Sequence, residues 1–502
     1  MSLIQINHLT FGYEGSFDLV FEDVSLKLDT AWRLGLIGRN GRGKTTLLRL
    51  LLGELDAGGQ IHSTVDFAYF PFPVDDPWRT AADLAEELSQ GAEQWRLLRE
   101  LRLLGMGEEA LYRPFGTLSQ GERAKVLLAC LFLRENTFPL IDEPTNHLDL
   151  AARESVEQYL EGKAGFILVS HDRALLDACT DHILSINRQD IELQKGNYSS
   201  WLENKTRRDD FERAENERLK QEIRHLSAAA KRASGWSDAV EKSKKGNRIA
   251  GLRPDRGAIG HKAAKMMKRA KSIETRLEAA AEEKGKLLRN LDTAETLKIR
   301  PLIHPKQVLV SCEDLSVCYG DSPVFSGLSF TVGRGERVVL SGRNGCGKSS
   351  VLKLLVGEEI PHTGRVTTTG GLKLSYIAQD TSFLKGSLRE YAQTRGVDES
   401  LFKAILRKLD FPRAQFEKDI ASFSEGQKKK VLIAGSLSEE SHLYLWDEPL
   451  NYIDLLSRQQ IEELLLAGQP AMIFVEHDRR FQERIATKRV EFGPAVKGES
   501  DV

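Results

Sequence analysis

The chain has 502 residues, of which 41% are hydrophobic and 29% are charged, and its formal net charge is −2. This length exceeds what one hydrophobic core normally supports, so the composition predicts a globular protein of two or three domains. No run approaches the roughly 20 apolar residues that cross a bilayer, and the N-terminus lacks the pattern of a signal peptide, which predicts no membrane pore in the chain. Five scattered cysteines without CxxC spacing indicate a reduced cytoplasmic protein and no zinc site.

The first 200 residues alternate short apolar runs with helical patterns, as a doubly wound α/β domain requires. Residues 33–37 predict a strand that leads into a glycine-rich loop. Residues 138–141 and 166–169 are typical of buried parallel strands, and a helix is expected after Gln120.

The glycine-rich loop matches the phosphate-binding pattern GxxxxGK[ST] between a predicted strand and a predicted helix. Its glycines let backbone N–H groups face phosphates, Lys44 would reach the outer phosphates of ATP, and Thr45 would hold Mg²⁺. The predicted ATP contacts of this loop are Gly38, Asn40, Gly41, Gly43, Lys44, Thr45 and Thr46.

A strand that ends in Asp142 and Glu143 supplies the carboxylates that such a loop needs. Asp142 fits a Mg²⁺ ligand acting through water, and Glu143 fits a general base for attack on the γ-phosphate. An Asp-Glu pair alone is usually a solvated loop, but this one follows an apolar strand and precedes Pro144.

Residues 201–245 are rich in Glu, Lys, Arg and Ala with apolar residues at helical spacing, and a second helical stretch covers 262–295. A glycine-rich piece separates them, so the pattern predicts a long helical hairpin. Residues 231–271 carry thirteen Lys or Arg and three Asp or Glu, a net charge of +10. This concentration indicates a polyanionic partner, with a solvated linker as the alternative. The predicted contacts to this polyanion are Lys242, Lys244, Lys245, Arg248, Arg253, Arg256, Lys262, Lys265, Lys268 and Arg269.

From about residue 306 the first domain repeats. Lys44 and Lys348 are 304 positions apart, and His171 and His477 are 306 apart, which indicates a duplicated domain. Strands are expected at 337–340, 443–446 and 472–475, and a helix after Glu425. Asp447 and Ser349 would hold Mg²⁺, and Glu448 would act as base. The predicted ATP contacts of the second loop are Gly342, Asn344, Gly345, Gly347, Lys348, Ser349 and Ser350.

Both copies resemble the ATP-binding cassette superfamily, whose signature segment is similar to Leu118–Glu122 and Phe423–Gln427. The resemblance implies two P-loop cassettes, residues 1–200 and 306–502, joined by a helical linker at 201–305. It implies head-to-tail pairing, with the signature of each copy completing the ATP site of the other. The signature residues implied for ATP binding are Ser424 and Gly426 at the Lys44 site, and Ser119 and Gly121 at the Lys348 site.

The same resemblance assigns further positions in each copy. Tyr13 and Tyr319 are similar to the aromatic platforms for adenine, His171 and His477 to the switch histidines that sense the γ-phosphate, Asp149 and Asp454 to the residues that couple the sites, and Gln379 to the glutamine that touches Mg²⁺. Three residues depart from the family pattern. Phe72 stands where the first copy should have that glutamine, and Gln120 and Glu425 replace a signature glycine.

The segment Asp142–Asp149, followed by Ser170–Arg173, resembles the ABC-F group of soluble translation ATPases. Residues 423–434, 445–455, 474–478 and 257–274 resemble its antibiotic-resistance branch, of the Lsa, Vga and Vml type.

This second resemblance implies a cytoplasmic monomer that hydrolyses ATP with Mg²⁺ and binds the bacterial 70S ribosome at the tRNA exit site. There the linker would contact large-subunit rRNA and P-site tRNA and dislodge lincosamides, pleuromutilins or streptogramin A, and hydrolysis would release the protein. Two alternatives stay open: a housekeeping or regulatory translation ATPase, and the tandem-cassette ATPase subunit of an importer.

Overall fold

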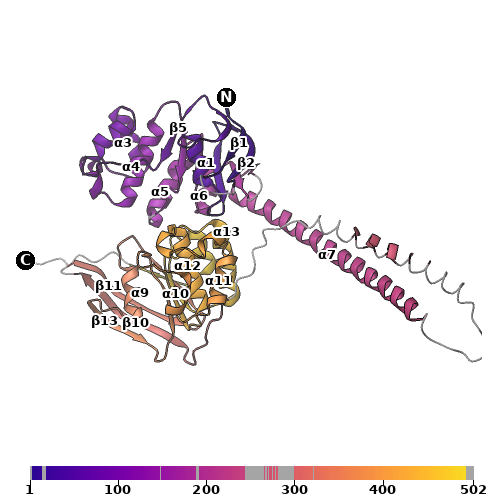
Figure 1. The fold of residues 1–502 in the computed structure, drawn as a ribbon. Coiled ribbons are helices and arrows are strands. Elements are labelled where there is room, and N and C mark those ends of the chain that lie inside the picture. The colour runs from indigo at the N-terminus through magenta and orange to yellow at the C-terminus, as the bar shows by residue number, and fades with distance from the viewer. Residues whose placement is uncertain are drawn as a thin grey trace, which may run out of the picture. The chain divides into compact units, whose positions relative to one another are not determined.

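The computed structural model describes residues 3–13, 19–146, 148–187, 191–243, 299–319 and 322–492, with 265, 268, 271–273, 275–277 and 279–280 of the linker. By internal contacts it forms two compact units, residues 1–199 with 294–502, and residues 200–293. The first unit contains both cassettes (Figure 1). Most of the predicted RNA contacts lie outside the described residues: Lys244, Lys245, Arg248, Arg253, Arg256, Lys262, Arg269 and the side chain of Lys242.

The first cassette is built on two sheets. One is antiparallel with the order β2-β1-β4, and the other has the order β5-β6-β7-β3-β8-β9, in which β9 alone runs antiparallel to its neighbour. The strands are β1 (Leu3–Phe11), β2 (Phe21–Asp29), β3 (Arg33–Gly38), β4 (Gly58–His62), β5 (Asp66–Phe70), β6 (Thr137–Asp142), β7 (Phe166–Val169), β8 (His182–Ile186) and β9 (Ile191–Lys195).

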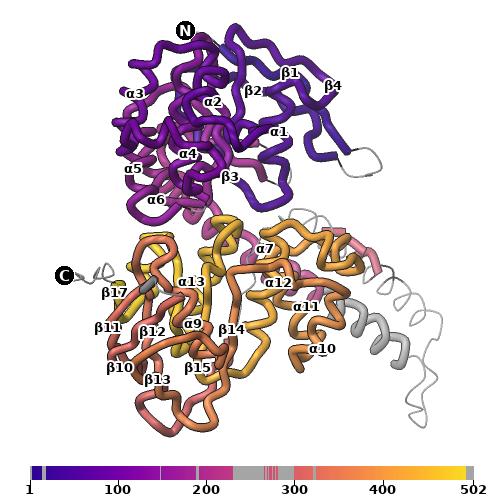
Figure 2. The backbone as a smooth tube through the Cα atoms, turned by 90° about the vertical axis from the view of Figure 1, so that its left-hand side faces the viewer, coloured from indigo at the N-terminus to yellow at the C-terminus, as the bar shows by residue number. Residues whose placement is uncertain are grey.

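Helices complete this cassette. Helix α1 follows β3, and both sheets and α1 contribute to one buried apolar cluster that includes Ile4, Leu36, Leu48 and Leu140. The helices are α1 (Lys44–Leu51), α2 (Ala81–Leu88), α3 (Gln94–Leu103), α4 (Gln120–Leu133), α5 (Leu150–Glu161) and α6 (Arg173–Cys179). Figures 1 and 2 show strands β1 and β2 on one side of the cassette and helices α3 and α4 on the other.

The second cassette repeats this plan. Its small sheet has the order β11-β10-β13, and its parallel sheet has the order β14-β15-β16-β12-β17. The strands are β10 (Val308–Tyr319), β11 (Ser322–Gly333), β12 (Arg337–Ser341), β13 (His362–Thr368), β14 (Leu374–Ile377), β15 (Leu443–Asp447), β16 (Met472–Val475) and β17 (Lys488–Glu491). The helices are α9 (Lys348–Val356), α10 (Leu388–Thr394), α11 (Glu399–Lys408), α12 (Glu425–Ser438), α13 (Leu455–Gly468) and α14 (Arg479–Ile485).

The predicted α/β architecture is confirmed, and the predicted strands coincide with β3, β6, β7, β12, β15 and β16. The signature helices begin at Gln120 and Glu425, as expected. The first linker helix is α7 (Tyr198–Ser243), a single helix of 46 residues. The described residues between 265 and 280 are helical as well, whereas residues 299–305 are not. No helix in the described ranges has both the length and the hydropathy to span a bilayer.

The cassettes meet at a buried network of ion pairs, which we call the switch junction (Arg173, Arg458, Glu462 and Asp478). Arg173 Nη1 donates to Glu462 Oε2 at 3.2 Å, and Arg173 Nη2 reaches the other Glu462 oxygen and lies 3.4 Å from Asp478 Oδ2. Arg458 holds the same Asp478 oxygen at 3.2 Å. Burial opposes ionisation of Asp478, but the two guanidinium groups outweigh it and hold its pKa below the ordinary value.

The internal repeat places Arg479 and Glu157 where Arg173 and Glu462 stand on the other side of the duplication. These mirror residues are not paired. Arg479 is 66% exposed and donates to Glu483 in its own helix at 3.0 Å, whereas Arg173 is 8% exposed. Of the two pairs that the repeat makes equivalent, the structure therefore forms the one between Arg173 and Glu462.

Replacing Arg173 with Met should lower the free energy of unfolding by about 1–3 kcal/mol, because Glu462, whose side chain is 0% exposed, would keep only Arg484 as an ion-pair partner among the described residues. Arg479→Met, at the exposed mirror position, should change it by less than about 0.5 kcal/mol. Scanning calorimetry of the full chain measures both. Equal effects of the two variants would contradict the assignment of the junction.

Candidate active site

Each phosphate-binding loop turns into its helix through a glycine in the left-handed region. Gly43 and Gly347 have φ of 94° and 95° and cap α1 and α9. A Cβ on Gly347 would lie 2.6 Å from the Phe325 ring, so a larger residue fits neither the backbone nor the space. Lys348 Nζ donates to the carbonyls of Gly342 at 2.8 Å and Arg343 at 2.9 Å, which holds the ammonium over the loop.

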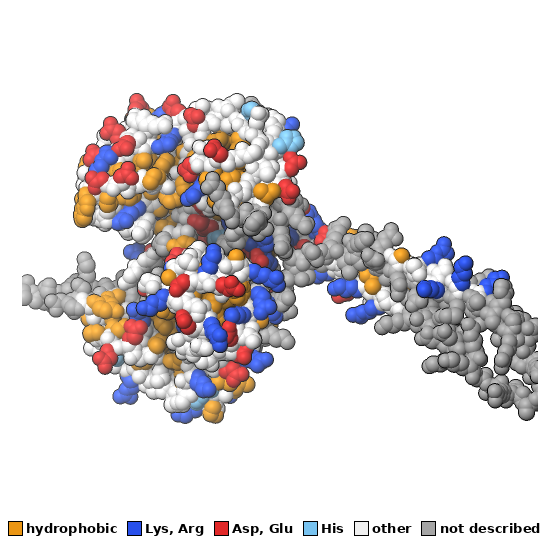
Figure 3. All heavy atoms as spheres, in the orientation of Figure 1, with side chains coloured by type: hydrophobic (Ala, Val, Ile, Leu, Met, Phe, Trp, Pro, Cys, Tyr) orange, Lys and Arg blue, Asp and Glu red, His pale blue; other side chains and the backbone are white. Residues whose placement is uncertain are grey.

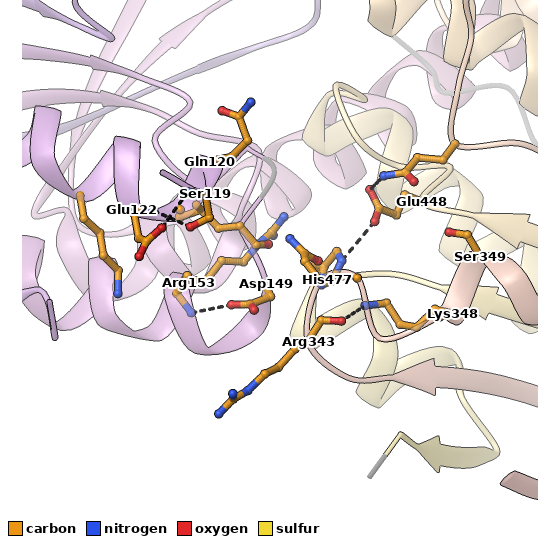
Figure 4. Close-up of a pocket in the computed structure, with 18 of the residues that line it drawn as sticks. Ser119, Gln120, Glu122, Asp149, Arg153, Arg343, Lys348, Ser349, Glu448 and His477 are labelled. Atoms are coloured by element: carbon orange, nitrogen blue, oxygen red, sulfur yellow. Dashed lines mark hydrogen bonds and ion pairs between the residues drawn. The ribbon is translucent and has the colours of Figure 1, made fainter. Parts of the chain in front are cut away.

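The Lys348 site is a cavity of about 860 Å³ lined by residues of both cassettes. Figure 4 shows Ser119 and Asp149 on one side of it and Lys348 and Glu448 on the other. Ser119 is presented by a capping box, in which its hydroxyl accepts from the Glu122 backbone N–H at 3.2 Å. The predicted residues gathered here are Ser119, Gly121, Asp149, Tyr319, Asn344, Gly345, Gly347, Lys348, Ser349, Ser350, Gln379, Glu448 and His477.

The Lys44 site is joined by a direct contact between the cassettes. Asn40 Nδ2 donates to the Tyr452 carbonyl at 2.7 Å. A Cβ on Gly426 would lie 3.0 Å from Asn40 Nδ2 and 2.6 Å from the Tyr452 carbonyl oxygen, so the signature needs glycine there. The equivalent Gly121 has only atoms of its own cassette within 4 Å. The structure thus brings each loop toward the opposite signature, more tightly at the Lys44 site.

The predicted adenine platforms lie beside the loops. Tyr13 is 48% exposed and its hydroxyl is 2.8 Å from Thr46 Oγ1. Tyr319 is 54% exposed and its hydroxyl is 3.1 Å from Ser350 Oγ. Each ring therefore has an open face close to the start of a phosphate-binding helix, as a base-stacking role requires.

Glu448 is an ionised carboxylate held by three side chains. Its Oε2 accepts from Gln379 Nε2 at 3.0 Å and Asn451 Nδ2 at 2.7 Å, and its Oε1 lies 3.2 Å from His477 Nε2. Burial opposes ionisation, but His477 and nearby cations outweigh it and lower the pKa. A carboxylate that is ionised near neutral pH can accept a proton from water.

Glu143, its counterpart in the first cassette, is in a different electrostatic state. Its nearest imidazole is His171, with Nε2 3.3 Å from Glu143 Oε1. Burial, with Asp142 beside it, raises the pKa of Glu143 to about 8. Burial also lowers the pKa of His171, with Lys44 acting in the same direction. The two predicted bases are therefore inequivalent.

The residues that depart from the family pattern explain part of the difference between Glu143 and Glu448. Phe72 stacks under the Arg134 guanidinium at 4.5 Å, so the first cassette has an apolar ring where the second has Gln379. The sequence did not reveal Tyr69, whose hydroxyl donates to Asp142 Oδ2 at 3.0 Å, or Asn451 as a partner of Glu448. An alignment of the two copies with each other could have identified Asn451, because the first copy has Asn146 at the same position.

Glu425, the acidic residue in the second signature, bonds within its own cassette. Its Oε2 accepts from Thr381 Oγ1 at 2.5 Å and its Oε1 from Lys428 Nζ at 3.0 Å. These partners outweigh the effect of burial and lower its pKa. Lys428 neutralises the charge of Glu425 locally, which reduces the repulsion between this carboxylate and a bound phosphate.

Both sites fit a divalent cation beside the phosphate loop. Thr45 Oγ1 lies 3.2 Å from Asp142 Oδ2. Burial raises the pKa of Asp447 to about 6, against a hydrogen bond from Ser349, and its Oδ1 is buried without a hydrogen-bond partner among the described residues. A buried carboxylate oxygen left over next to a hydroxyl is the oxygen donor set that Mg²⁺ prefers.

Glu476 precedes His477, the second predicted switch histidine, at the position where the first copy has Ser170. It is 3% exposed, and its oxygens accept from the backbone N–H groups of Leu450 at 2.8 Å and His477 at 3.3 Å. Burial raises its pKa to about 7, although Arg458 acts in the opposite direction. The native state therefore keeps a proton between pH 4.5 and about 7 that the unfolded state has lost, and stability falls as pH rises through this window.

Glu476→Gln leaves one of the two backbone N–H groups without its acceptor at every pH, so its effect on the thermal unfolding midpoint should be more favourable at pH 8 than at pH 5. The free-energy difference between the two pH values is at most about 3 kcal/mol, because the amide removes a buried charge that is present only at the higher pH. Glu483→Gln, at an exposed glutamate of α14, is the matched control and should show no such pH dependence. Equal effects at both pH values would contradict the raised pKa.

Comparison with known proteins agrees with this geometry. The profile of the ABC transporter family matches residues 21–146 and 325–451, which together make up half of the chain. The ribosome protection protein VmlR of Bacillus subtilis is 28% identical over 497 residues, covering 95% of this chain and 85% of its own. The energy-dependent translational throttle protein EttA of Haemophilus influenzae is 27% identical over 532 residues, covering 95% and 90%.

Solved structures share the fold. Archaeal ribosome recycling factor aABCE1, in complex with ribosomal stalk protein aP1, aligns with a TM-score of 0.63 at 20% identity over 97% of this chain and 87% of its own. A structure titled RNase-L Inhibitor aligns with a TM-score of 0.58 at 19% identity, covering 92% and 83%.

These matches confirm the resemblance to ABC-F proteins and the ATPase assignment made from the motifs. Two copies of the family's domain, each with a phosphate-binding loop, a strand-end Asp-Glu pair and a signature helix, lie in one chain. The chain therefore belongs to the ABC transporter family and is an ATP hydrolase that carries its ATP-binding cassette twice.

Proposed function

We propose that this protein is an ATP-gated clamp that binds the bacterial 70S ribosome at the tRNA exit site and protects it from drugs of the large subunit. The observation that carries the proposal is the pairing of two composite ATP sites with a linker that concentrates a net charge of +10 in residues 231–271. Similarity to VmlR along 95% of this chain supports the choice of target. The same proposal divides the chain into a first cassette (1–200), a linker (201–305) and a second cassette (306–502).

In this mechanism each site hydrolyses ATP with residues of both cassettes. Lys44 and Lys348 would bind the outer phosphates, and Ser424 and Ser119 would bind them from the opposite cassette. Glu143 and Glu448 would accept the proton of the attacking water, with His171 and His477 orienting it. Mg²⁺, held by Thr45 and Asp142 or by Ser349, Asp447 and Gln379, would supply charge stabilisation at the phosphates.

ATP binding would draw each signature onto the opposite loop, and the contact between Asn40 and Tyr452 is how such a closed site is built. Only the closed form would present both cassettes and the linker together to the ribosome. Loss of the γ-phosphate would remove the bridge between the cassettes and release the protein.

The linker would supply the contacts to nucleic acid. Lys265 and Lys268 are helical residues with exposed side chains. Figure 3 shows Lys and Arg side chains gathered on the described part of the linker. Exposed ammonium and guanidinium groups bind phosphate without reading sequence, which suits large-subunit rRNA and P-site tRNA. The uncharged residues among them would approach the site of lincosamides, pleuromutilins and streptogramin A.

A Glu143→Gln and Glu448→Gln double variant should remain on ribosomes in the presence of ATP, because binding needs the closed form and release needs hydrolysis. Co-sedimentation through a sucrose cushion measures the bound fraction. Lys44→Ala with Lys348→Ala is the matched control, and it should stay in the supernatant. A double Gln variant that also stays there would count against ribosome binding.

A housekeeping translation ATPase is the second candidate, favoured by the similarity to EttA over 90% of that protein's length. Drug susceptibility separates the two. Cells expressing this chain should tolerate several-fold more of at least one of the three drug classes, and the double Gln variant should give no protection. Unchanged susceptibility, with ATP hydrolysis still stimulated by ribosomes, would favour the housekeeping role.

A further inference from the structure

Three consecutive lysines follow the second signature, and each has a separate partner. Lys428 pairs with Glu425 at 3.0 Å, and Lys430 forms a buried pair with Asp454 at 2.9 Å. Lys429 lies between them, is 2% exposed and donates from Nζ to two backbone carbonyls, Ala378 at 3.2 Å and Gln379 at 2.9 Å. A lysine this buried is uncommon unless its charge is used.

The loop that Lys429 holds carries Gln379, whose side chain donates to Glu448 at 3.0 Å. Four carboxylates lie close enough to favour the charged form of Lys429, Glu476 most strongly, and burial outweighs them and lowers its pKa. One ammonium therefore connects helix α12 to the loop beside the predicted base of the Lys348 site.

The first cassette lacks both partners of this arrangement. Ala124 stands at the position of Lys429, and Phe72 stands at the position of Gln379. The lysine and the glutamine are present together in one copy and missing together in the other. In that other copy, the described contacts of Glu143 are with the backbone N–H and the imidazole of His171, and they include no side-chain amide. A purely structural lysine in α12 gives no reason for this joint loss.

We propose that Lys429 is a positioning residue for ATP hydrolysis at the Lys348 site. By fixing the carbonyls of Ala378 and Gln379, it holds the Gln379 amide against Glu448 and keeps that carboxylate aimed into the cavity. Lys429 itself touches neither substrate nor attacking water. Because α12 begins at the signature that meets Asn40, the same residue joins the helix of one ATP site to the loop of the other.

Single-turnover hydrolysis in a Glu143→Gln background tests this, because phosphate then forms at the Lys348 site alone. Lys429→Met should slow hydrolysis about tenfold, and Gln379→Ala, which also removes a proposed Mg²⁺ ligand, should slow it at least as much. Both changes together should be no slower than Gln379→Ala alone, because Lys429 acts through Gln379. Lys429→Arg, which keeps the donors, should stay within about threefold of the parent.

Two further measurements separate positioning from damage to the fold. ATP affinity, titrated without Mg²⁺ by a fluorescent analogue, should change less than about twofold in Lys429→Met. In a Glu448→Gln background, which leaves the Lys44 site active, Lys429→Met should also stay within about twofold, although α12 carries the signature of that site. Lys403→Met, at a half-buried lysine that pairs with Glu399, is the control substitution.

Multiplicative losses for Lys429→Met and Gln379→Ala would overturn the proposal, because the two residues would then act separately. An equal loss at the Lys44 site would overturn it as well, because it would mean a distorted α12. If Lys429→Met does not fold, Lys429→Leu takes its place with the same expected values.

Discussion

The switch junction is the interaction on which the rest of the structure depends. Arg173 comes two residues after one switch histidine, and its partner Asp478 comes directly after the other. A guanidinium buried between two carboxylates has a strict geometry, because a displaced charge in that environment costs several kcal/mol. An ion pair therefore joins the loops that would sense the γ-phosphate in the two sites.

The junction is asymmetric although the sequence around it is repeated. The pair on one side is formed and buried, its mirror is open, and the same inequality appears at the ATP sites. The Lys44 site has a cassette-to-cassette hydrogen bond and an acid whose pKa is about 8. The Lys348 site has a cavity and an ionised base with three donors. Two sites of unequal closure and unequal acidity are suited to hydrolysis at different rates.

Much of the candidate site could be predicted from the sequence, because each short motif allows few local backbone conformations. A glycine loop between a strand and a helix, or a Ser three residues before Glu or Gln, has few ways to fold, so the positions of Lys348 and Ser119 were predictable. The partners of Arg173 and Lys429 were not predictable, nor was Thr381 as a partner of Glu425, since each of these contacts joins segments that the linear pattern does not relate. Aligning the two copies would have predicted some of the differences between the two sites, because positions where the copies differ, such as Phe72 and Gln379, mark where the sites diverge. The tip of the linker lies outside the described residues, so its predicted role remains a prediction.

We propose that ATP closes the cassettes around each other so that the linker can act on the ribosome. Cryo-electron microscopy of the Glu143→Gln and Glu448→Gln variant with bacterial 70S ribosomes and ATP tests this most directly. We expect both cassettes to be closed in the tRNA exit site, the Arg173 and Glu462 side chains to be in contact, and residues 246–261 to be directed toward the peptidyl transferase centre. Ribosomes without bound protein, or protein bound at a different site with the linker turned away from the tRNA, would contradict it.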